Sequence, residues 1–465
     1  MEGIIYKPVV DHAKCGVCSI CMASCPADKI PELQTETDSV RGKIYQQFQP
    51  QPLVVGEATE PVPPCRLNCP LNQDVSGYLR LISQGRFPEA LALVRETNPL
   101  PSVCGYVCHR PCESACYRGA VDNSLSIRSM KRFLTDLELD MEIPKTVAGK
   151  TGCKVVIIGS GPAGLTAAHD LALKGHEVEI FESYSQPGGM LVWAIPEFRL
   201  PRNALQRDIN FLKSLGIKIR LNQVFGSDLT IADLKAQGAS AVILAAGTMK
   251  SLNLGLEASK SENTIIDCLS FLNRFNQRDY AGIGRKAVIV GGGNAALDSA
   301  RAVLAAGVEA VDILYRRRRK EMPVDPSEIE DALKEGVKIK FQTIPIKVQT
   351  VDGKIKGLDC LKTEMVAVEG RLRKRPVPIA DSEFFVEADT VISAVGQEVD
   401  YEAVLPGFSG SSSDGLWDIS DDTTMISHWE GVFAAGDFVN GAGTVVDAMA
   451  SGRKCAQAVN RYVSK

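Results

Sequence analysis

The residues with the clearest chemistry are cysteines close to the N-terminus. Cys15-x2-Cys18-x2-Cys21-x3-Cys25-Pro26 has the spacing of a bacterial ferredoxin loop. Such a loop wraps one [4Fe–4S] cube, and its fourth cysteine usually ligates a neighbouring cluster. A zinc site and a run without metal are the alternatives. No second run of this kind occurs in residues 1–64, so Cys25 either completes its own cluster or reaches one held further along the chain.

More cysteines follow a connector rich in glutamine and proline. The chain has 14 cysteines, and the later ones of the dense region are Cys65, Cys69, Cys104, Cys108, Cys112 and Cys116. The N-terminus lacks the basic and apolar regions of a signal peptide. Because thiols stay reduced in the cytoplasm, this spacing favours metal ligation over disulfides, and we expect a cytoplasmic protein. A net charge of −4 and the lack of a long apolar run predict no nucleic-acid partner and no membrane segment.

Two strand–turn–helix segments match the dinucleotide-binding fingerprint. In the first, residues 155–164 (VVIIGSGPAG) form a buried strand, a glycine turn and the start of an alanine-rich helix. The glycines allow a tight turn, a close approach of pyrophosphate to the helix N-terminus and close helix–strand packing. The next strand ends in an acid, which can accept from ribose hydroxyls. The candidate residues of this first site are Gly159, Gly161, Pro162, Ala163, Gly164 and Glu182, and because a second nucleotide fold lies within the same sequence, we expect its dinucleotide to be FAD.

The second fingerprint ends in basic residues instead of an acid. Residues 287–296 (AVIVGGGNAA) repeat the strand, turn and helix, and the next strand runs into Arg316-Arg317-Arg318-Arg319-Lys320. Guanidinium groups hold a 2′-phosphate by charge-assisted hydrogen bonds, so NADP(H) is favoured over NAD(H), which stays open. A solvated basic turn and a docking site for an acidic partner are the alternatives. The assigned NADP residues are Gly291, Gly293, Asn294, Ala295, Ala296, Arg316 and Arg317.

The C-terminal segment has the residues to close a flavin site. Residues 432–437 (VFAAGD) read as a strand that ends in Gly436 and Asp437, and a helix opens at Thr444 and Val445. Asp437 can bind a ribityl hydroxyl, and the helix N-terminus directs partial positive charge at the flavin.

The elements that position these residues define the fold class. We expect an α/β protein with two Rossmann-like domains in a glutathione-reductase-like tandem, preceded by an α-helical iron–sulfur domain and a short ferredoxin-like segment. The expected boundaries are 1–45 for the ferredoxin-like [4Fe–4S] segment, 46–64 for a linker, 65–145 for the helical iron–sulfur domain, 146–280 and 397–465 for the two parts of the FAD-binding domain, and 281–396 for the NAD(P)H-binding domain.

Over residues 64–465 the chain resembles the small subunit of glutamate synthase and its relatives. These include the large subunit of NADH-dependent ferredoxin:NADP oxidoreductase and the N-terminal part of dihydropyrimidine dehydrogenase. The resemblance rests on residues 104–116 (CGYVCHRPCESAC), both fingerprints, Gly188-Gly189-Met190-Leu191 and residues 195–201 (IPEFRLP). It implies FAD contacts for Gly189, Met190, Arg199, Ala246 and Gly247, and a 2′-phosphate site at Arg316 and Arg317.

The resemblance also implies iron–sulfur clusters in the helical domain. The residues assigned to metal are Cys15, Cys18, Cys21, Cys25, Cys65, Cys69, Cys108, Cys112 and Cys116. Cys104 ranks last among the candidates, because several relatives replace it. The chain departs from the family in lacking a Cys-x-x-Cys ahead of Cys65 and in placing Lys131 where relatives often have a non-cysteine ligand. One hypothesis is that the N-terminal unit supplies the missing ligands, which gives two clusters in total.

The implied function is an FAD-dependent NAD(P)H oxidoreductase subunit. Hydride would pass from the nicotinamide to the flavin and single electrons to the clusters, with a ferredoxin-like protein or a catalytic subunit as partner. An electron-bifurcating transhydrogenase subunit, a glutamate synthase small subunit and a non-catalytic nucleotide-binding assembly subunit are the alternatives. No residue is assigned to acid–base catalysis.

Overall fold

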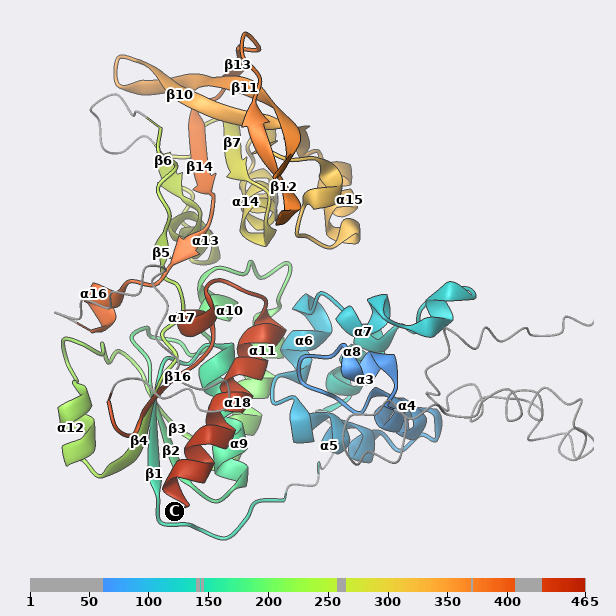
Figure 1. The fold of residues 1–465 in the computed structure, drawn as a ribbon, viewed down its shortest axis with the longest axis vertical. Helices are drawn as coiled ribbons and strands as arrows, with labels where there is room; N and C mark the ends of the chain where they lie inside the picture. Colours follow the sequence, from blue (N-terminus) through green and yellow to red (C-terminus); the bar gives the residue numbers. More distant parts are fainter. Residues whose placement is uncertain are drawn as a thin grey trace, which may run out of the picture. The chain divides into compact units, whose positions relative to one another are not determined.

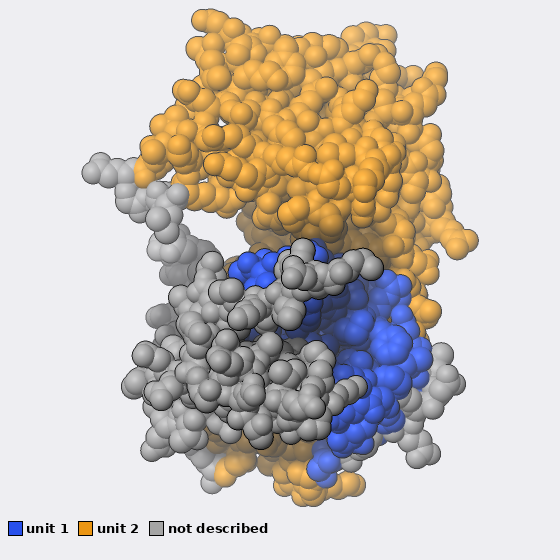
Figure 2. Space-filling model, turned by 90° about the vertical axis from the view of Figure 1, so that its right-hand side faces the viewer, with its two compact units in different colours: residues 1–147 blue, residues 148–465 orange. Residues whose placement is uncertain are grey.

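The computed structural model describes residues 62–138, 143, 146–256, 265–368, 371–405 and 429–464. The ferredoxin-type motif Cys15–Cys25 lies outside the described residues. The chain divides into two compact units, residues 1–147 and 148–465, which Figure 2 colours separately. In the described part of the chain, none of the helices combines the length and hydrophobicity that a transmembrane helix requires.

The described part of the first unit is helical (Figure 1). Its elements are α3 (Pro64–Leu67), α4 (Val75–Ser83), α5 (Phe87–Thr97), α6 (Pro101–Val107), α7 (Pro111–Ser114), η3 (Tyr117–Ala120) and α8 (Ile127–Asp136). Proline stands in the first turn of α3, α5, α6 and α7, where its fixed φ favours a helix start. The core of this unit packs Tyr78, Leu91 and Leu134 with Cys65 and Cys112. Two candidate metal ligands therefore belong to the core.

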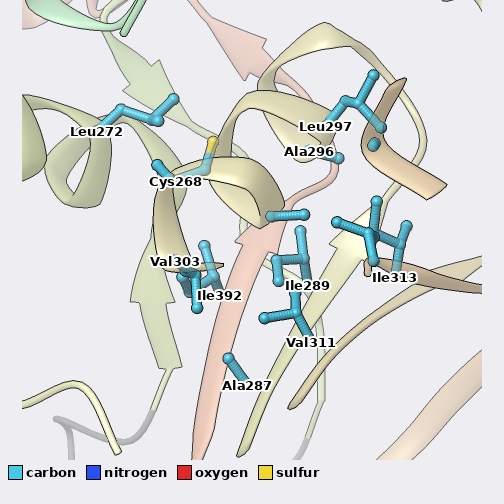
Figure 3. Close-up of a cluster of buried hydrophobic side chains, with 14 of the residues drawn as sticks. Cys268, Leu272, Ala287, Ile289, Ala296, Leu297, Val303, Val311, Ile313 and Ile392 are labelled. Atoms are coloured by element: carbon cyan, nitrogen blue, oxygen red, sulfur yellow. The ribbon is translucent and has the colours of Figure 1, made fainter. Parts of the chain in front are cut away.

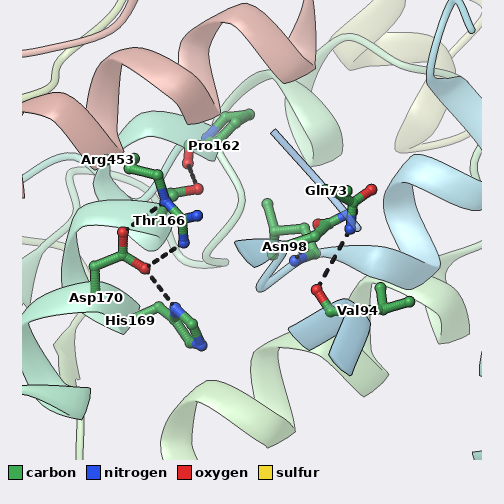
Figure 4. A network of polar contacts seen from close by, with 9 residues as sticks. Gln73, Val94, Asn98, Pro162, Thr166, His169, Asp170 and Arg453 are labelled. Carbon is green, nitrogen blue, oxygen red and sulfur yellow. Dashed lines mark hydrogen bonds and ion pairs between the residues drawn. The ribbon is translucent and has the colours of Figure 1, made fainter. Parts of the chain in front are cut away.

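The second unit contains a first parallel sheet of five strands in the order β16-β4-β1-β2-β3. The strands are β1 (Lys154–Ile158), β2 (Glu177–Phe181), β3 (Lys218–Arg220), β4 (Ala239–Leu244) and β16 (Val432–Ala434). Helices α9 (Pro162–Leu173) and α18 (Val445–Val463) lie side by side (Figure 1). An ion pair between Asp170 and Arg453 at 2.8 Å joins them (Figure 4). Strand β16 therefore completes a sheet whose β1 begins at residue 154. The last helix, α18, packs against α9, which follows β1.

A second parallel sheet has five strands in the order β6-β14-β7-β8-β9. These are β6 (Ile265–Asp267), β7 (Lys286–Gly291), β8 (Ala310–Tyr315), β9 (Lys338–Phe341) and β14 (Thr390–Ala394). Helices α13 (Cys268–Asn276), α14 (Asn294–Ala305) and α15 (Pro326–Glu335) accompany the sheet. Figure 3 shows its core, in which Ile289, Ile313 and Ile392 from three strands meet Ala296 and Val303 of α14. The alternation of strand and helix produces the parallel sheets, as the sequence predicts.

The boundary of this second sheet differs from the predicted one. Strand β6 and helix α13 lie inside the range 146–280 that the sequence assigns to the first part of the FAD-binding domain, yet β6 pairs with β14. The chain crosses between the sheets at β5 (Lys250–Ser251), which pairs with β15 (Gln397–Glu398). A strand of three residues carries too little hydrophobic pattern to reveal which sheet it joins.

Residues 343–387 form an antiparallel sheet that the sequence pattern does not predict. It contains β10 (Thr343–Val351), β11 (Lys354–Val368), β12 (Arg371–Pro378) and β13 (Phe384–Glu387). The hairpin between β10 and β11 turns at Asp352 and Gly353, whose φ angles are 51° and 71°. Two positive φ angles are the requirement of a type I′ turn, which Asp-Gly satisfies. Strand β10 of this sheet contacts β8.

The remaining elements of the second unit are short, apart from one helix. They are α10 (Met190–Trp193), α11 (Arg202–Ser214), α12 (Ile231–Ala236), η5 (Arg319–Glu321), α16 (Tyr401–Val404) and α17 (Asp437–Asn440).

Candidate functional site

The first glycine turn joins β1 to α9 and has one glycine open to a ligand. A Cβ on Gly164 would lie 2.0 Å from the carbonyl oxygen of Gly159, so α9 packs directly on the turn. A Cβ on Gly161, in contrast, would meet no other protein atom within 4 Å. Gly161 is the N-cap of α9, where backbone N–H groups point outward. The space over Gly161 therefore fits a phosphate at a helix N-terminus.

The acid at the end of the second strand also organises this turn. One carboxylate oxygen of Glu182 accepts from the Ser160 backbone N–H at 2.9 Å and from the Ser160 hydroxyl at 2.5 Å. The other accepts from the Tyr184 backbone N–H at 3.0 Å. A carboxylate has about four lone-pair sites, so Glu182 retains little capacity for a ribose. The role of Glu182 in binding FAD stays a prediction, and its role in holding the turn is the observed one.

The Gly188-Gly189 turn lies against the first glycine turn. The Ser160 hydroxyl accepts from the Gly188 backbone N–H at 3.0 Å. A Cβ on Gly189 would lie 2.9 Å from the Cα of Gly161, and Gly189 has a φ of 54°. Glycine is thus required at 189 by close backbone approach as well as by backbone angle. Met190, which follows, packs against the core of the second sheet.

The C-terminal segment meets the same turn at Ala163. A Cβ on Gly436 would lie 2.6 Å from the Cβ of Ala163, and one on Gly452 of α18 would lie 2.1 Å from its carbonyl oxygen. Burial raises the pKa of Asp437 to about 6, while a bond from the Gly443 backbone N–H opposes the rise. These contacts bring β16, α18 and α9 together around one alanine.

The start of α18 and the crossing after β4 complete the surroundings of the first turn. Thr444 is the N-cap of α18 and accepts from the backbone N–H of Asp447 at 3.3 Å. Val445 is the first residue of that helix and is half-buried. Ala246 and Gly247 follow β4, and the adjacent Thr248 is buried with no hydrogen-bond partner for its hydroxyl among the described residues. A buried hydroxyl without a partner is consistent with a ligand that completes it.

The second glycine turn repeats the construction of the first. A Cβ on Gly291 would lie 2.3 Å from the carbonyl oxygen of Ala394, and one on Gly292 would lie 2.1 Å from the ring of Tyr315. A Cβ on Gly293 would meet no other protein atom within 4 Å. Gly293 is the N-cap of α14, and Asn294, Ala295 and Ala296 form the first turn of that helix. Each turn therefore has packed glycines on the strand side and an open one at the helix N-terminus.

In the basic run after β8, the first two arginines and the next two have different surroundings. Arg318 faces Glu321 at 3.7 Å, and Arg319 pairs with Glu330. Arg316 and Arg317 form no ion pair with any described residue, while their carbonyl oxygens are fixed by Thr363 and Gln342. One terminal nitrogen of Arg317, Nη1, is buried and has no hydrogen-bond partner among the described residues. The first two arginines are therefore the pair available for an anion.

A third arginine joins this pair and was not predicted from the sequence. Burial lowers the pKa of Arg317, and the positive charges of Arg373 and Arg316 lower it further. Arg373 lies on β12 and is exposed. Repulsion among three cations is relieved when an anion binds between them. The basic residues Arg371, Arg373, Lys374 and Arg375 were the sequence signal, but only the structure shows that the charge of Arg373 acts on Tyr315, at the end of β8, and on Arg317.

Arg199, in the segment after α10, contacts two helices of the second sheet. Its guanidinium donates to Asp298 at 2.6 Å and to Glu328 at 3.1 Å, and it contacts Asn294 at 3.4 Å. Asp298 and Asn294 belong to α14 and Glu328 to α15, so the contacts of Arg199 are with elements of the second sheet. An FAD contact for Arg199 remains a prediction, since its nearest partners are on the nicotinamide side.

In the first unit, several candidate ligands surround two buried polar side chains. Burial raises the pKa of Tyr78 well above its usual range, and the charges of Cys112, Cys69, Cys65 and Cys108 add to the rise. The Tyr78 hydroxyl is buried and has no hydrogen-bond partner among the described residues. Lys131 is also buried, and its ammonium donates to Gln73 Oε1 at 2.7 Å. A negatively charged group that accepts hydrogen bonds is what these two side chains lack.

The cysteines are not arranged for a single ion. Among the described residues, no set of three or more His, Cys, Asp or Glu side chains could hold one metal ion. A four-iron cube separates its thiolates more widely than one ion does, so this finding leaves the cube as a group that fits beside the buried Tyr78 hydroxyl and the Lys131 ammonium. Cys116 precedes η3 and is half-buried.

Two family descriptions match the chain. That of pyridine nucleotide-disulphide oxidoreductase matches residues 153–452, and that of dihydropyrimidine dehydrogenase domain II, 4Fe-4S cluster, matches residues 59–143. These ranges contain both glycine turns and the cysteines from Cys65 to Cys116. FAD, NADP(H) and [4Fe–4S] as cofactors are confirmed by these families, whereas the number of clusters stays a prediction.

Named relatives cover most of the chain. The β subunit of the NADP(+)-dependent formate dehydrogenase of Moorella thermoacetica is 37% identical over 425 residues, which are 86% of this chain and 60% of that protein. The β subunit of the NADPH-Fe(3+) oxidoreductase of Geobacter sulfurreducens is 35% identical over 86% of this chain and 64% of its own length. The chain thus spans less than two thirds of these two relatives. The glutamate synthase [NADPH] small chain of Azospirillum brasilense is 32% identical, over 86% of each chain.

Solved structures agree on the fold of the second unit. Mycobacterium tuberculosis FprA in complex with NADPH superposes with a TM-score of 0.56 at 18% identity, over 67% of this chain and 84% of that one. Lactococcus lactis thioredoxin reductase gives a TM-score of 0.50 at 21% identity. At this identity the likeness concerns the fold alone, and it confirms the predicted tandem of nucleotide-binding domains.

Proposed function

Because the chain belongs to the pyridine nucleotide-disulphide oxidoreductase family, and within it to the group of the glutamate synthase small chain, we propose that it is an electron-transfer subunit that moves electrons between NADP(H) and iron–sulfur clusters by way of FAD. The reducing equivalents enter or leave at the second glycine turn. We place the chain in the reducing cytoplasm, where its many cysteines can serve as cluster ligands.

The observation that carries this proposal is the contrast between the two glycine turns. Both have an open glycine at a helix N-terminus, Gly161 in one and Gly293 in the other. The strand after the first turn ends in Glu182, whereas the strand after the second ends in Arg316 and Arg317 without carboxylate partners among the described residues. The carboxylate of Glu182 would repel a 2′-phosphate at the first site, whereas the two arginines suit the 2′-phosphate of NADP(H) at the second.

The residues of the chain bind and position the cofactors, which supply the redox chemistry. When bound, FAD exchanges a hydride with the nicotinamide and single electrons with the clusters. The helix N-terminus at Gly161 is suited to neutralise the FAD pyrophosphate, and that at Gly293 the NADP(H) pyrophosphate. Arg199, by its bonds to Asp298 and Glu328, holds the segment after α10 against α14 and α15.

The partner that we propose is a ferredoxin-like protein or a catalytic subunit. Two relatives are described as β subunits, one of a formate dehydrogenase and one of an NADPH-Fe(3+) oxidoreductase. A cysteine-rich segment on the same chain as a nucleotide-binding unit supports a route for single electrons to another protein. The terminal substrate site then lies on the partner.

Anaerobic reduction of the flavin-loaded chain tests the proposal. NADPH is expected to bleach the flavin at lower concentration than NADH does, and reduced clusters are expected in the EPR spectrum after NADPH or, for clusters of low potential, after dithionite. Flavin that is bleached by NADH alone would contradict the 2′-phosphate site. A chain that binds FAD but is not reduced by either nucleotide would instead indicate the assembly subunit.

A further inference from the structure

Arg316 and Arg317, which form no ion pair with any described residue, are anchored through their backbone. The Thr363 hydroxyl donates to the carbonyl oxygen of Arg316 at 2.8 Å, and the Gln342 backbone N–H donates to that of Arg317 at 3.0 Å. Neither donor belongs to the basic run, because Gln342 lies between β9 and β10 and Thr363 lies on β11. The antiparallel sheet and the turn that leads into it therefore hold the backbone of the two arginines.

The two anchoring residues also bond to each other. The side-chain nitrogen of Gln342 donates to the carbonyl oxygen of Thr363 at 2.7 Å, and the Thr363 backbone N–H donates to the carbonyl oxygen of Gln342 at 2.9 Å. Only 1% of the Thr363 surface is exposed, so water competes little for these bonds. Gln342 and Thr363 therefore act as one rigid pair.

Gln342 has a backbone conformation that normally suits glycine. Its φ of 51° lies in the left-handed region, which a side chain makes unfavourable. Glycine would adopt this angle freely, but it has no amide to bond to Thr363. Strained residues of this kind persist where the surrounding structure enforces them, and they are frequent at ligand sites. Phe341, the last residue of β9, pairs with Tyr315, the last of β8, so Gln342 is the first residue after β9 that reaches the basic run.

The other end of the basic run is anchored as well. The Glu321 carboxylate accepts from the Arg318 backbone N–H at 3.1 Å, and the Glu321 carbonyl oxygen accepts from the Tyr315 hydroxyl at 2.7 Å. Tyr315 also borders the second glycine turn, since a Cβ on Gly292 would lie 2.1 Å from its ring. The segment from Arg316 to Glu321 is thus fixed at both ends.

A fixed backbone improves an anion site for two reasons. The carbonyl oxygens of Arg316 and Arg317 already accept hydrogen bonds, so they compete less for the guanidinium N–H groups that a phosphate needs. Arginines on a backbone that is already ordered also lose less conformational entropy when they close on a ligand. Without these anchors, the two arginines would keep their charge and bind a phosphate less tightly.

We propose that Gln342 and Thr363 are positioning residues for nucleotide specificity: by holding the backbone of the arginine pair, they set the preference for NADPH over NADH. The inference rests on the proposed function, because it requires the 2′-phosphate to bind at Arg316 and Arg317. NADH lacks this phosphate and gains nothing from the anchors. Because the nicotinamide is the other end of the nucleotide, the anchors affect KM for NADPH and leave kcat unchanged.

Thr363→Val in the FAD-loaded full chain tests the inference, because it removes the hydroxyl at nearly constant volume. The loss of one hydrogen bond is expected to raise KM for NADPH, and Kd for adenosine 2′,5′-bisphosphate in titration calorimetry, about 3- to 10-fold. In contrast, kcat, KM for NADH and Kd for adenosine 5′-phosphate should stay within about twofold. Thr363→Ser should restore the preference. A loss shared by both adenosine ligands, or no loss, would overturn the role of Thr363.

Thr390→Val is the matched control for this variant. Thr390 is 3% exposed and lies on β14, and its hydroxyl accepts from the Gly284 backbone N–H at 2.9 Å and donates to Asp389 at 3.1 Å. The control therefore removes an equally buried hydroxyl from the same unit and should leave the nucleotide preference unchanged. If Thr390→Val weakened the preference as much as Thr363→Val did, general destabilisation would explain the effect and the inference would fail.

Gln342→Gly keeps the test decisive if Thr363→Val does not fold. Glycine accepts a φ of 51° and removes only the amide, so the same selective loss is expected. Arg278→Gly, at an exposed residue with a φ of 61°, is the control. An unchanged preference in Gln342→Gly would overturn the role of Gln342. Equal Kd of the unaltered chain for the two adenosine ligands would instead refute the 2′-phosphate site of the proposed function, on which the inference depends.

Discussion

Arg199 donates to Asp298 across 2.6 Å and so joins the segment after α10 to the helix that starts at the second glycine turn. Both side chains are largely buried, and burial raises the pKa of Asp298 to about 6 although Arg199 opposes the rise. Glu328 adds a second carboxylate to the same guanidinium at 2.9 Å. Arg199 is therefore one of the residues that join this segment to the second sheet, together with Asn276, which donates to the carbonyl oxygens of Val192 and Ile195.

Replacing Arg199 should weaken the contact between the segment after α10 and helices α14 and α15. Both glycine turns should remain in place. We expect Arg199→Met to lower the free energy of unfolding by about 3 kcal/mol, because it leaves buried carboxylates unpaired. Addition of Asp298→Asn should recover part of the loss in a double-mutant cycle. Urea denaturation measures the effect. The exposed pair Arg285–Glu309 gives the control, where Arg285→Met should change stability by less than about 1 kcal/mol. Equal losses in both pairs would contradict the bridging role.

Arg317 should determine the preference for NADPH. Its buried Nη1 has no partner among the described residues, and a hydrogen bond to a charged group contributes about 1.5–3 kcal/mol, so Arg317→Ala should raise KM for NADPH about 10- to 100-fold. KM for NADH should stay within about twofold. Arg319→Ala is the matched control, since Arg319 is two residues away and pairs with Glu330. Steady-state dye reduction measures KM for each nucleotide. An equal rise of KM for both nucleotides would exclude a 2′-phosphate contact.

Arg373 should contribute to the same preference from another sheet. Because Arg373 is exposed, solvent screens its charge, and we expect Arg373→Ala to raise KM for NADPH by a smaller factor, about 3- to 10-fold. The effect should fade as salt concentration rises, because ions screen exposed charges. Lys374→Ala, on the adjacent exposed residue, is the control. If KM for NADPH were insensitive to Arg373 at low salt, the antiparallel sheet would have no part in binding.

Gly161 and Gly164 should respond differently to the same added methyl group. Gly164→Ala forces a Cβ to 2.0 Å from a carbonyl oxygen, so we expect a loss of stability of about 1–3 kcal/mol or more, with or without FAD. Gly161→Ala has open space around the Cβ, so the flavin-free chain should keep its stability and lose FAD affinity. Thermal denaturation and flavin titration separate the two outcomes. Equal destabilisation of the flavin-free chain by both changes would show that Gly161 is a packing residue.

Asp437 should make the stability of the flavin-free chain depend on pH. Its pKa is raised in the folded chain from 3.8 to about 6, so folding takes up a proton between these values and stability falls as the pH rises through this window. Asp437→Asn removes that loss. The melting temperature of the variant should therefore gain on that of the unaltered chain between pH 4 and 6 and keep a constant lead above that range. A constant difference from pH 4 upward would contradict the raised pKa.

The sequence by itself determined the α/β class, the two nucleotide-binding domains and the identity of the cofactors, because each depends on local order. A glycine-rich turn between a buried strand and a helix adopts one characteristic backbone conformation. Residues 155–164 and 287–296 carry the sequence pattern of this turn. Whether the next strand ends in an acidic or a basic residue can also be read from a short stretch of sequence. Family membership confirms the cofactors, while the individual binding residues stay predictions.

Only the tertiary structure decided which groups meet across long stretches of chain. In the structure, Glu182 accepts a hydrogen bond from Ser160 and Arg199 donates one to Asp298. The charge of Arg373 acts on Arg317. The tertiary structure also placed β6 in the second sheet and the Lys131 ammonium beside Gln73. Each of these contacts joins segments whose local pattern is unremarkable, so the choice of partner follows from helix and sheet packing and leaves no periodic signal in the sequence.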